Sequence, residues 1–154
     1  MLTTKNGENL ITKEIARYLS EIKIPIRLAC ITDTGWPLVI SLWFVFMNQK
    51  LYCSTQKTAK VIEFLTQNPR CGFEIASDQP PYRGVRGKGR VTFSEEIGPK
   101  VLGILMDRYE IRNDSTLGKY LLSNLNNEIA LEIEPIRIFT WDYSDRMKDA
   151  KIKK

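Results

Sequence analysis

Three short segments in the first third of the chain are rich in branched and aromatic residues, and mostly polar turn sequences separate them. The segments cover 26–32, 38–47 and 51–54. A connection of a few residues can join antiparallel neighbours, whereas parallel neighbours need a crossover of about a dozen residues or more. The pattern therefore predicts three consecutive antiparallel strands, and this meander limits the folds that the whole chain can adopt.

The rest of the chain adds further strands and four helices. Strands are expected at 70–76, at 82–93 and at 129–134, where Pro135 interrupts the pattern before 137–143. Helices are expected at 12–22, 58–67, 96–110 and 115–125. About six strands without the regular alternation of a parallel α/β sheet predict a mainly β (α+β) domain, an antiparallel six-stranded barrel with flanking helices.

The length of 154 residues suits one domain, so we expect a single domain over 1–154 with its barrel core at about 25–143. No apolar stretch approaches the roughly 20 residues of a membrane span. The cysteines Cys30, Cys53 and Cys71 form neither a disulfide framework nor a C-x-x-C pair. We therefore expect a cytoplasmic protein with buried thiols and no membrane contact.

Charge and the absence of histidine narrow the function. The formal net charge is +5, but residues 146–154 carry five basic side chains and one acidic one, so this basic tail supplies most of it. Nucleic-acid surfaces need cations clustered on a folded face, and we do not expect nucleic acid as a partner. A chain without histidine lacks Ser-His-Asp and Cys-His catalysis and histidine ligands for zinc or haem, and we expect no metal.

The segment at 51–60 brings groups that bind anions to one place. Ser54 and Thr55 end a strand, a helix begins near Thr58, and Lys57 and Lys60 lie beside that start. Hydroxyls, ammonium groups and the N–H groups of a helix start are the donors that hold a phosphate. The same pattern also arises where Thr58 only caps the helix and the lysines are solvated, so by itself it leaves both interpretations open.

The strand at 82–93 alternates cations with small residues. Arg86, Lys88 and Arg90 share one face. They lie either in solvent or against an anion or an acidic partner. The glycines between them fall inside a strand, so they do not form a G-x-G-x-x-G nucleotide loop.

Two tryptophans are further candidates. Trp43 lies in an apolar strand and is expected more often in a core than at a cofactor, whereas Trp141 near the chain end needs a surface to dock on. A neighbouring subunit would provide that surface. No pair of acidic residues has a spacing that singles it out for proton transfer, so the catalytic residues stay unknown.

Three phrases, in their order and spacing, resemble the FMN-binding split barrels related to pyridoxamine 5′-phosphate oxidase. They are PLVISLWFVFMNQKLYCST-x-K-x-x-K, then NPRCGFEI with YRGVRGKGRV, and last WDYS. The likeness runs over about 27–143. It implies a split β-barrel of FMN-binding type that forms a homodimer with the flavin at the interface.

The resemblance also implies roles for individual residues. The family holds the cofactor phosphate where the third strand meets the following helix, and an arginine at the start of the first strand lies nearby. The strands that carry Trp43 and Cys53 pass along the flavin. The dimer interface would order the terminal segment that carries Trp141, and Arg86 is a looser match. The implied cofactor-binding residues are Arg27, Trp43, Cys53, Ser54, Thr55, Lys57, Lys60, Arg86 and Trp141.

The chain departs from the true oxidase where that enzyme binds its substrate. Thr32 replaces a substrate-binding lysine, Gly84 falls at a flavin-contacting glutamine, and the S-R-P-x-x-S and R-x-H motifs are absent. We therefore expect an FMN-dependent oxidoreductase with another, unknown small-molecule substrate. The alternatives are a non-catalytic flavin carrier or sensor, a deazaflavin-dependent reductase, and a cofactor-free interaction barrel that binds an acidic partner.

Overall fold

A computed structural model describes residues 11–149 of the chain, so the last residues of the basic tail at 146–154 lie outside the described part. The four predicted helices form with ends close to those expected. They are α1 (Lys13–Glu21), α2 (Lys60–Gln67), α3 (Gly98–Arg108) and α4 (Thr116–Ser123), followed by a short 3-10 turn, η1 (Leu125–Asn127). None of the helices in residues 11–149 is long and apolar enough to cross a membrane.

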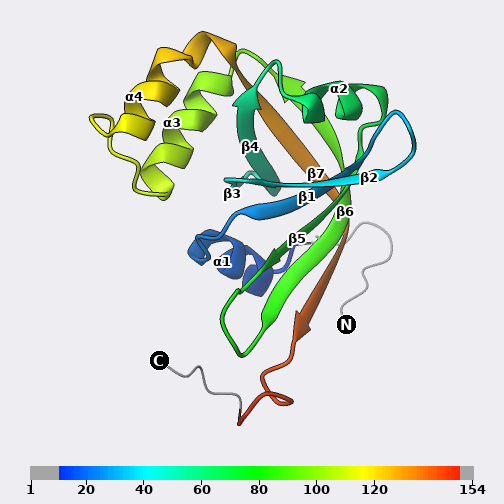
Figure 1. Ribbon diagram of the computed structural model, residues 1–154. Helices are drawn as coiled ribbons and strands as arrows, with labels where there is room; N and C mark the ends of the chain where they lie inside the picture. The colour runs from blue at the N-terminus through cyan, green and yellow to red at the C-terminus, as the bar shows by residue number, and fades with distance from the viewer. Residues whose placement is uncertain (1–10, 150–154) are drawn as a thin grey trace.

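The predicted antiparallel barrel with flanking helices is confirmed, with seven strands instead of six. The strands are β1 (Ile26–Ile31), β2 (Pro37–Leu42), β3 (Val45–Met47), β4 (Lys50–Gln56), β5 (Arg70–Ala76), β6 (Arg83–Ser94) and β7 (Glu128–Asp142). Their order in the sheet is β2-β1-β5-β6-β7-β4-β3. The sheet curls strongly, with β5, β6 and β7 as its long central strands (Figure 1).

The additional strand arises because the apolar run at 38–47 breaks at Trp43 and Phe44. β2 pairs with β1 and β3 pairs with β4, at the two opposite edges of the sheet. The chain therefore crosses from one edge to the other inside a segment that reads as one strand. Phe44 at the break is fully buried, and its backbone N–H donates to Tyr109 Oη at 3.3 Å. This crossing curls the sheet into a barrel.

The predicted interruption at Pro135 is wrong, because β7 runs unbroken through it. Pro135 pairs with Gly89 where the register between β6 and β7 shifts by one residue. A proline has no N–H to donate and is tolerated in a sheet at such a bulge. The strand bends here and continues to the end of the barrel.

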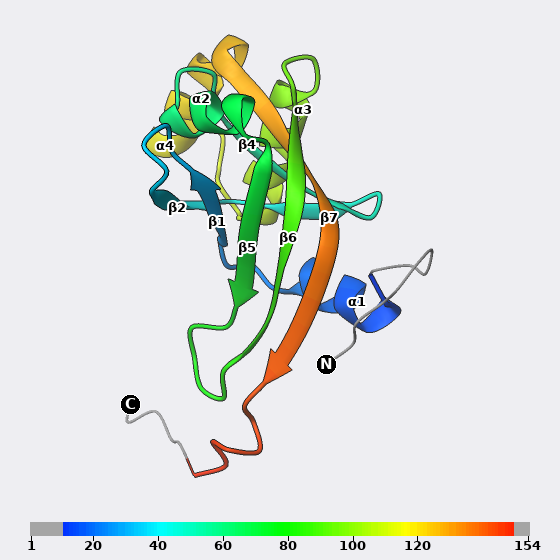
Figure 2. The ribbon, with the colours of Figure 1, turned by 90° about the vertical axis from the view of Figure 1, so that its right-hand side faces the viewer.

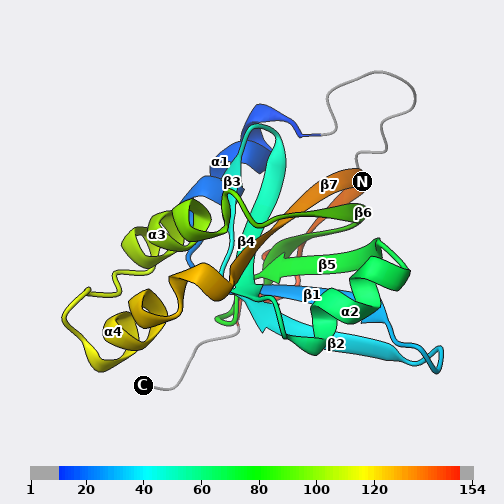
Figure 3. The same ribbon diagram turned by 90° about the horizontal axis from the view of Figure 1, so that it is seen from above.

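The main core fills the inside of the barrel. Helix α1 contributes Ile15 and Leu19, and α2 contributes Val61 and Leu65. Helix α3 covers a second, smaller core outside the sheet, where Val101 and Leu105 pack on residues of β4 and β7. Seen from above, α3 and α4 lie to one side of the sheet and α2 lies near β1 and β2 (Figure 3).

Arg108 in the last turn of α3 joins that helix to α1. Its guanidinium donates to the carbonyl oxygens of Leu19 at 3.0 Å and Ser20 at 2.8 Å, and also to that of Ile22. The last carbonyls of a helix have no partner inside the helix. Arg108 therefore caps the C-terminal end of α1 and fixes its position against the barrel.

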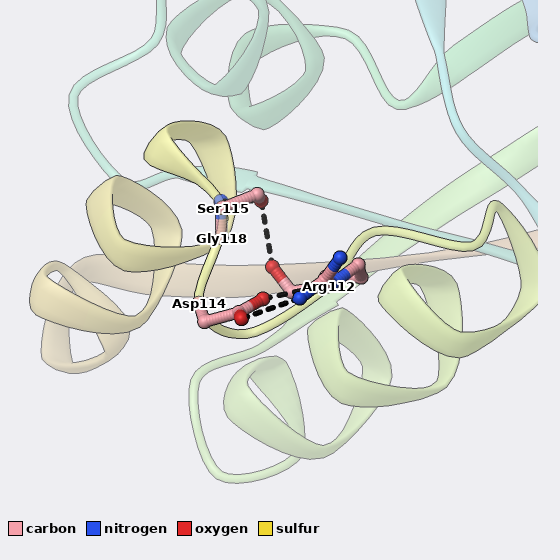
Figure 4. A network of polar contacts seen from close by, with 4 residues as sticks. All are labelled: Arg112, Asp114, Ser115 and Gly118. Carbon is pink, nitrogen blue, oxygen red and sulfur yellow. Dashed lines mark hydrogen bonds and ion pairs between the residues drawn. The ribbon is translucent and has the colours of Figure 1, made fainter.

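A compact corner holds the start of α4 (Figure 4). Ser115 Oγ accepts from the N–H of Gly118 at 3.0 Å and donates to the carbonyl of Arg112 at 2.6 Å. Arg112 also pairs with Asp114 through two hydrogen bonds. A Cβ at Gly118 would lie 2.0 Å from the carbonyl oxygen of Arg112, so only glycine fits. The corner is closed by its own hydrogen bonds.

Candidate functional site

The junction of β4 and α2 places the predicted anion-binding residues together. Ser54 and Thr55 lie near the end of β4, Lys57 lies in the connection, and Lys60 is the first residue of α2. The interpretation in which Thr58 caps the helix is wrong: Ala59 occupies the N-cap position, and no side chain makes a cap hydrogen bond there. The N–H of Ile62 donates to the carbonyl of Ala59 at 3.0 Å. The first two N–H groups of the helix, those of Lys60 and Val61, have no partner inside it and can receive an outside acceptor.

Both lysines at this junction pair with exposed carboxylates. Lys57 Nζ lies 2.8 Å from Glu95 Oε2, and Lys60 Nζ lies 3.0 Å from Glu63 Oε2. Ion pairs of exposed side chains contribute little, typically about 0–1 kcal/mol. A phosphate, which accepts several charge-assisted hydrogen bonds, can therefore replace these carboxylates at small cost.

A buried carboxylate beside the junction was missed by the sequence reasoning. Glu128 at the start of β7 is only 3% exposed, and it accepts from Ser54 Oγ and Gln56 Nε2 at 2.5 Å each. Its neighbours come from β4, which is far away in sequence but paired in register with β7. Ser54 thus already has an internal partner, and no motif in the sequence signals this contact.

Three other predicted residues lie in different surroundings. Arg27 in β1 is exposed and donates to Ser41 Oγ at 2.8 Å. Trp43 stacks on Tyr109 with ring centroids 5.4 Å apart. Cys53 is fully buried in the main core, so any contact of a ligand with this position would involve the strand rather than the thiol.

The buried state expected for the cysteines is confirmed. All three are free and buried. Burial raises the pKa of the Cys71 thiol to about 11 and raises the pKa of Cys53 as well. A thiol acts as a nucleophile only as the thiolate, so these residues do not supply a reactive group near neutral pH.

A cavity of about 670 Å³ opens at the other end of the molecule, between α1 and the ends of β6 and β7. Tyr18 of α1, Arg83 and Gly84 of β6, and Trp141 of β7 are among its lining residues. Tyr18 Oη donates to the carbonyl of Ile75 at 3.2 Å, and burial raises the pKa of this tyrosine. The Nε1 of Trp141 is buried and has no hydrogen-bond partner within the described part of the chain.

The predicted anion-binding residues and Trp141 therefore lie near opposite ends of β7. Ser54 pairs with Ala130 near the start of β7, and Gly84 pairs with Trp141 near its end. Eleven residues of strand at about 3.3 Å each give a path of roughly 35 Å along β7 between these points. Figure 2 shows α2 at the upper end of the sheet and α1 beside its lower half.

Solved structures with this arrangement identify the fold. The chain is similar to conserved hypothetical protein Rv2991 from Mycobacterium tuberculosis, with a TM-score of 0.73, 20% identity, and coverage of 98% of this chain and 96% of that one. It is similar to an F420 reductase, with a TM-score of 0.67, 17% identity, and coverage of 80% and 94%. It is also similar to a candidate pyridoxamine 5′-phosphate oxidase from Listeria innocua, with a TM-score of 0.63, 16% identity, and coverage of 82% and 94%.

This chain has the split-barrel fold of the flavin-binding proteins related to pyridoxamine 5′-phosphate oxidase. No family profile matches the sequence, and no curated protein matches it at the sequence level. Because the identities lie at or below 20%, the similarity concerns the split barrel itself, and the site must be argued from its own residues.

Proposed function

We propose that this split-barrel protein binds FMN through its phosphate at the start of α2 and acts as an FMN-dependent oxidoreductase on a small molecule. The observation that carries the proposal is the uncapped start of α2 with Lys57 and Lys60 beside it. Thr55 and the two lysines hold the phosphate. Arg27 lies opposite Glu74, as Arg86 does, and is assigned with Arg86 to the other part of the site. The bound flavin would supply hydride-transfer chemistry, while the protein positions and shields it.

The path of roughly 35 Å between the anion-binding residues and Trp141 favours a homodimer. One FMN molecule is too short to reach from Lys60 to Trp141 of the same copy. In a two-fold dimer each surface contributes twice, so Trp141 of a second copy can complete the site of the first. Arg86, on the exposed face of β6, is assigned to the same end of the site.

The dimer has a direct test in mixed variants. Lys60→Ala and Trp141→Ala each damage one half of every site. When the two variants are mixed and allowed to exchange subunits, about a quarter of the sites should regain both intact halves. Flavin binding that returns to this level supports the shared site, and mixtures that bind no better than the separate variants contradict it.

The first experiment on the function is an absorbance spectrum of the purified protein before and after adding FMN and removing the excess. Retained flavin bands are expected, and a protein that stays colourless overturns the proposal. Anaerobic addition of NADH or NADPH then separates an oxidoreductase, whose flavin bleaches, from a carrier or sensor, whose flavin stays oxidised. The free, buried cysteines suit a cytoplasmic location, which we propose as well.

A second candidate is a deazaflavin-dependent reductase, because one similar structure is an F420 reductase. The open start of α2 would hold the phosphate of either cofactor. A protein that refuses FMN but retains the absorbance of an added deazaflavin would establish this alternative.

A further inference from the structure

Five cations gather on the exposed face of the central strands. They are Arg70 of β5, Arg86, Lys88 and Arg90 of β6, and Arg137 of β7, and we call them the cationic face. All five are exposed. No helix lies in front of β5, β6 and β7 on this side (Figure 2). The face is therefore accessible in the single copy.

The strand register places like charges directly opposite each other. Arg70 pairs with Arg90, and Lys88 pairs with Arg137. Side chains directly opposite in an antiparallel pair lie on the same face, and like charges in these positions are destabilising. Within residues 11–149, none of the five cations takes part in an ion pair. At these two cross-strand pairs the fold therefore keeps a repulsion that neutral polar residues would avoid.

The size of the face points to a small ligand. Three rows about 7 Å apart on three strands about 5 Å apart cover roughly 14 by 10 Å. Carboxylates occupy two opposite corners of this area: Glu74 lies opposite Arg86 and Glu134 lies opposite Arg90. A long polyanion would meet these acids, whereas a ligand with two or three linked phosphates fits between them. Arginine is the side chain whose planar fork matches phosphate oxygens.

The floor of the cationic face is open. Gly72 lies opposite Lys88, and a Cβ placed on it would meet nothing closer than Ala29 Cβ at 3.8 Å. Its neighbours in the same row, Lys88 and Ala29, lie on β6 and β1. A ligand can therefore lie against the sheet between the rows of cations.

We propose that the cationic face binds a small ligand that carries two or more linked phosphate groups. This site is separate from the start of α2. It shares Arg86 with the residues assigned to the flavin, and Arg27 borders it across Glu74. It supplies the protein with a second anionic ligand, such as a co-substrate, held by the sheet rather than by a helix end.

Gly72 allows a test that leaves every cation in place. The probe is inorganic tripolyphosphate, titrated calorimetrically into the full chain, with orthophosphate for comparison. Gly72→Glu puts a carboxylate among the cations, and Gly72→Gln is the neutral control of the same shape. We expect wild type and Gly72→Gln to bind tripolyphosphate alike and Gly72→Glu to bind it about tenfold more weakly. Gly72→Glu should also unfold at a higher temperature than Gly72→Gln, because it relieves the repulsion.

Three results would overturn the proposal. The site is refuted if tripolyphosphate binds no more tightly than orthophosphate, or if it binds equally well to both Gly72 variants. Binding that Lys60→Ala abolishes and Gly72→Glu leaves intact places the ligand at α2 instead. A single-stranded oligonucleotide that binds more tightly than tripolyphosphate makes the surface one for nucleic acid. If the Gly72 variants fail to fold, Lys88→Gln with Arg137→Gln provides the same comparison, and unchanged binding there also refutes the site.

Discussion

Helices α2 and α4 each have eight residues, and they begin in opposite ways. The start of α4 is closed, because Ser115 accepts from the N–H of Gly118 and donates to the carbonyl of Arg112. The start of α2 has Ala59 at the cap position with no side-chain hydrogen bond, and Lys60 follows it. In both helices the third N–H has an acceptor, the Ser115 side chain in α4 and the Ala59 carbonyl in α2. Only the start of α2 has two lysines beside it and no cap side chain over its first N–H groups, and such a start attracts an anion. The difference indicates that the start of α4 has a structural role and that the start of α2 binds a ligand.

The largest effect is expected from breaking the closed start. Gly118→Ala should lower the free energy of unfolding by about 3 kcal/mol, because its Cβ would overlap the carbonyl oxygen of Arg112. Urea unfolding measures the change. Gly103→Ala is the control in α3, where a Cβ meets nothing within 4 Å; it should raise stability by about 0.5–1 kcal/mol. Equal effects of the two variants would show that the corner tolerates a side chain.

Removing the cap of α4 should have a smaller effect on stability and none on binding. Ser115→Ala leaves the N–H of Gly118 without its acceptor, and we expect a loss of about 1 kcal/mol in unfolding free energy. FMN affinity should stay at the wild-type value in a fluorescence titration. A marked loss of FMN affinity would mean that α4 belongs to the binding site.

Adding a cap side chain to α2 should raise stability and lower FMN affinity. The backbone of Ala59 already has the extended conformation of a cap residue, so Ala59→Ser can accept from the helix N–H groups. We expect stability to rise by about 1 kcal/mol. FMN affinity should fall about threefold or more, because the hydroxyl competes with the phosphate for the same donors. Stability and affinity that rise together would contradict the role given to this helix start.

The smallest effect on FMN affinity is expected from replacing the carboxylate that pairs with Lys60. Glu63→Gln removes the exposed ion pair at 3.0 Å and frees the ammonium group for a phosphate. FMN affinity should rise about twofold, since an exposed pair contributes little. The matching change Glu21→Gln in α1, which breaks the exposed pair with Arg17, should leave the affinity unchanged. A decrease on Glu63→Gln would place this side chain on the ligand.

Much of the sheet could be predicted from the sequence because its signals are local. The alternation of Val85, Arg86, Gly87 and Lys88 gives the buried and exposed faces of β6 directly, and the structure confirms it. The break at Trp43 could not be predicted, because it depends on closing the barrel rather than on local propensity. The effect of Pro135 could not be predicted for a similar reason. Its partner Gly89 lies in another strand, β6, and the bulge is in the pairing of β6 with β7.

In the candidate site, too, local features could be predicted from the sequence and contacts between distant residues could not. The lysines beside α2 follow from a short sequence pattern, and the structure places Lys57 and Lys60 at one helix start. The identity of the cap residue depends on where the turn ends: the sequence allowed Thr58 as a cap, whereas the structure has Ala59 there. The buried contact between Glu128 and Ser54 joins positions far apart in the chain, so no local pattern could reveal it.

The central proposal is that the FMN phosphate binds at the start of α2. The most direct measurement is a calorimetric titration of FMN and of riboflavin, which lacks the phosphate, into wild type, Lys60→Ala, and Lys100→Ala as an exposed lysine of α3. We predict that wild type and Lys100→Ala prefer FMN over riboflavin by about tenfold or more, and that Lys60→Ala loses most of this preference while its riboflavin affinity is unchanged. Equal affinities for FMN and riboflavin in the wild type, or a preference that survives Lys60→Ala in full, would contradict the account.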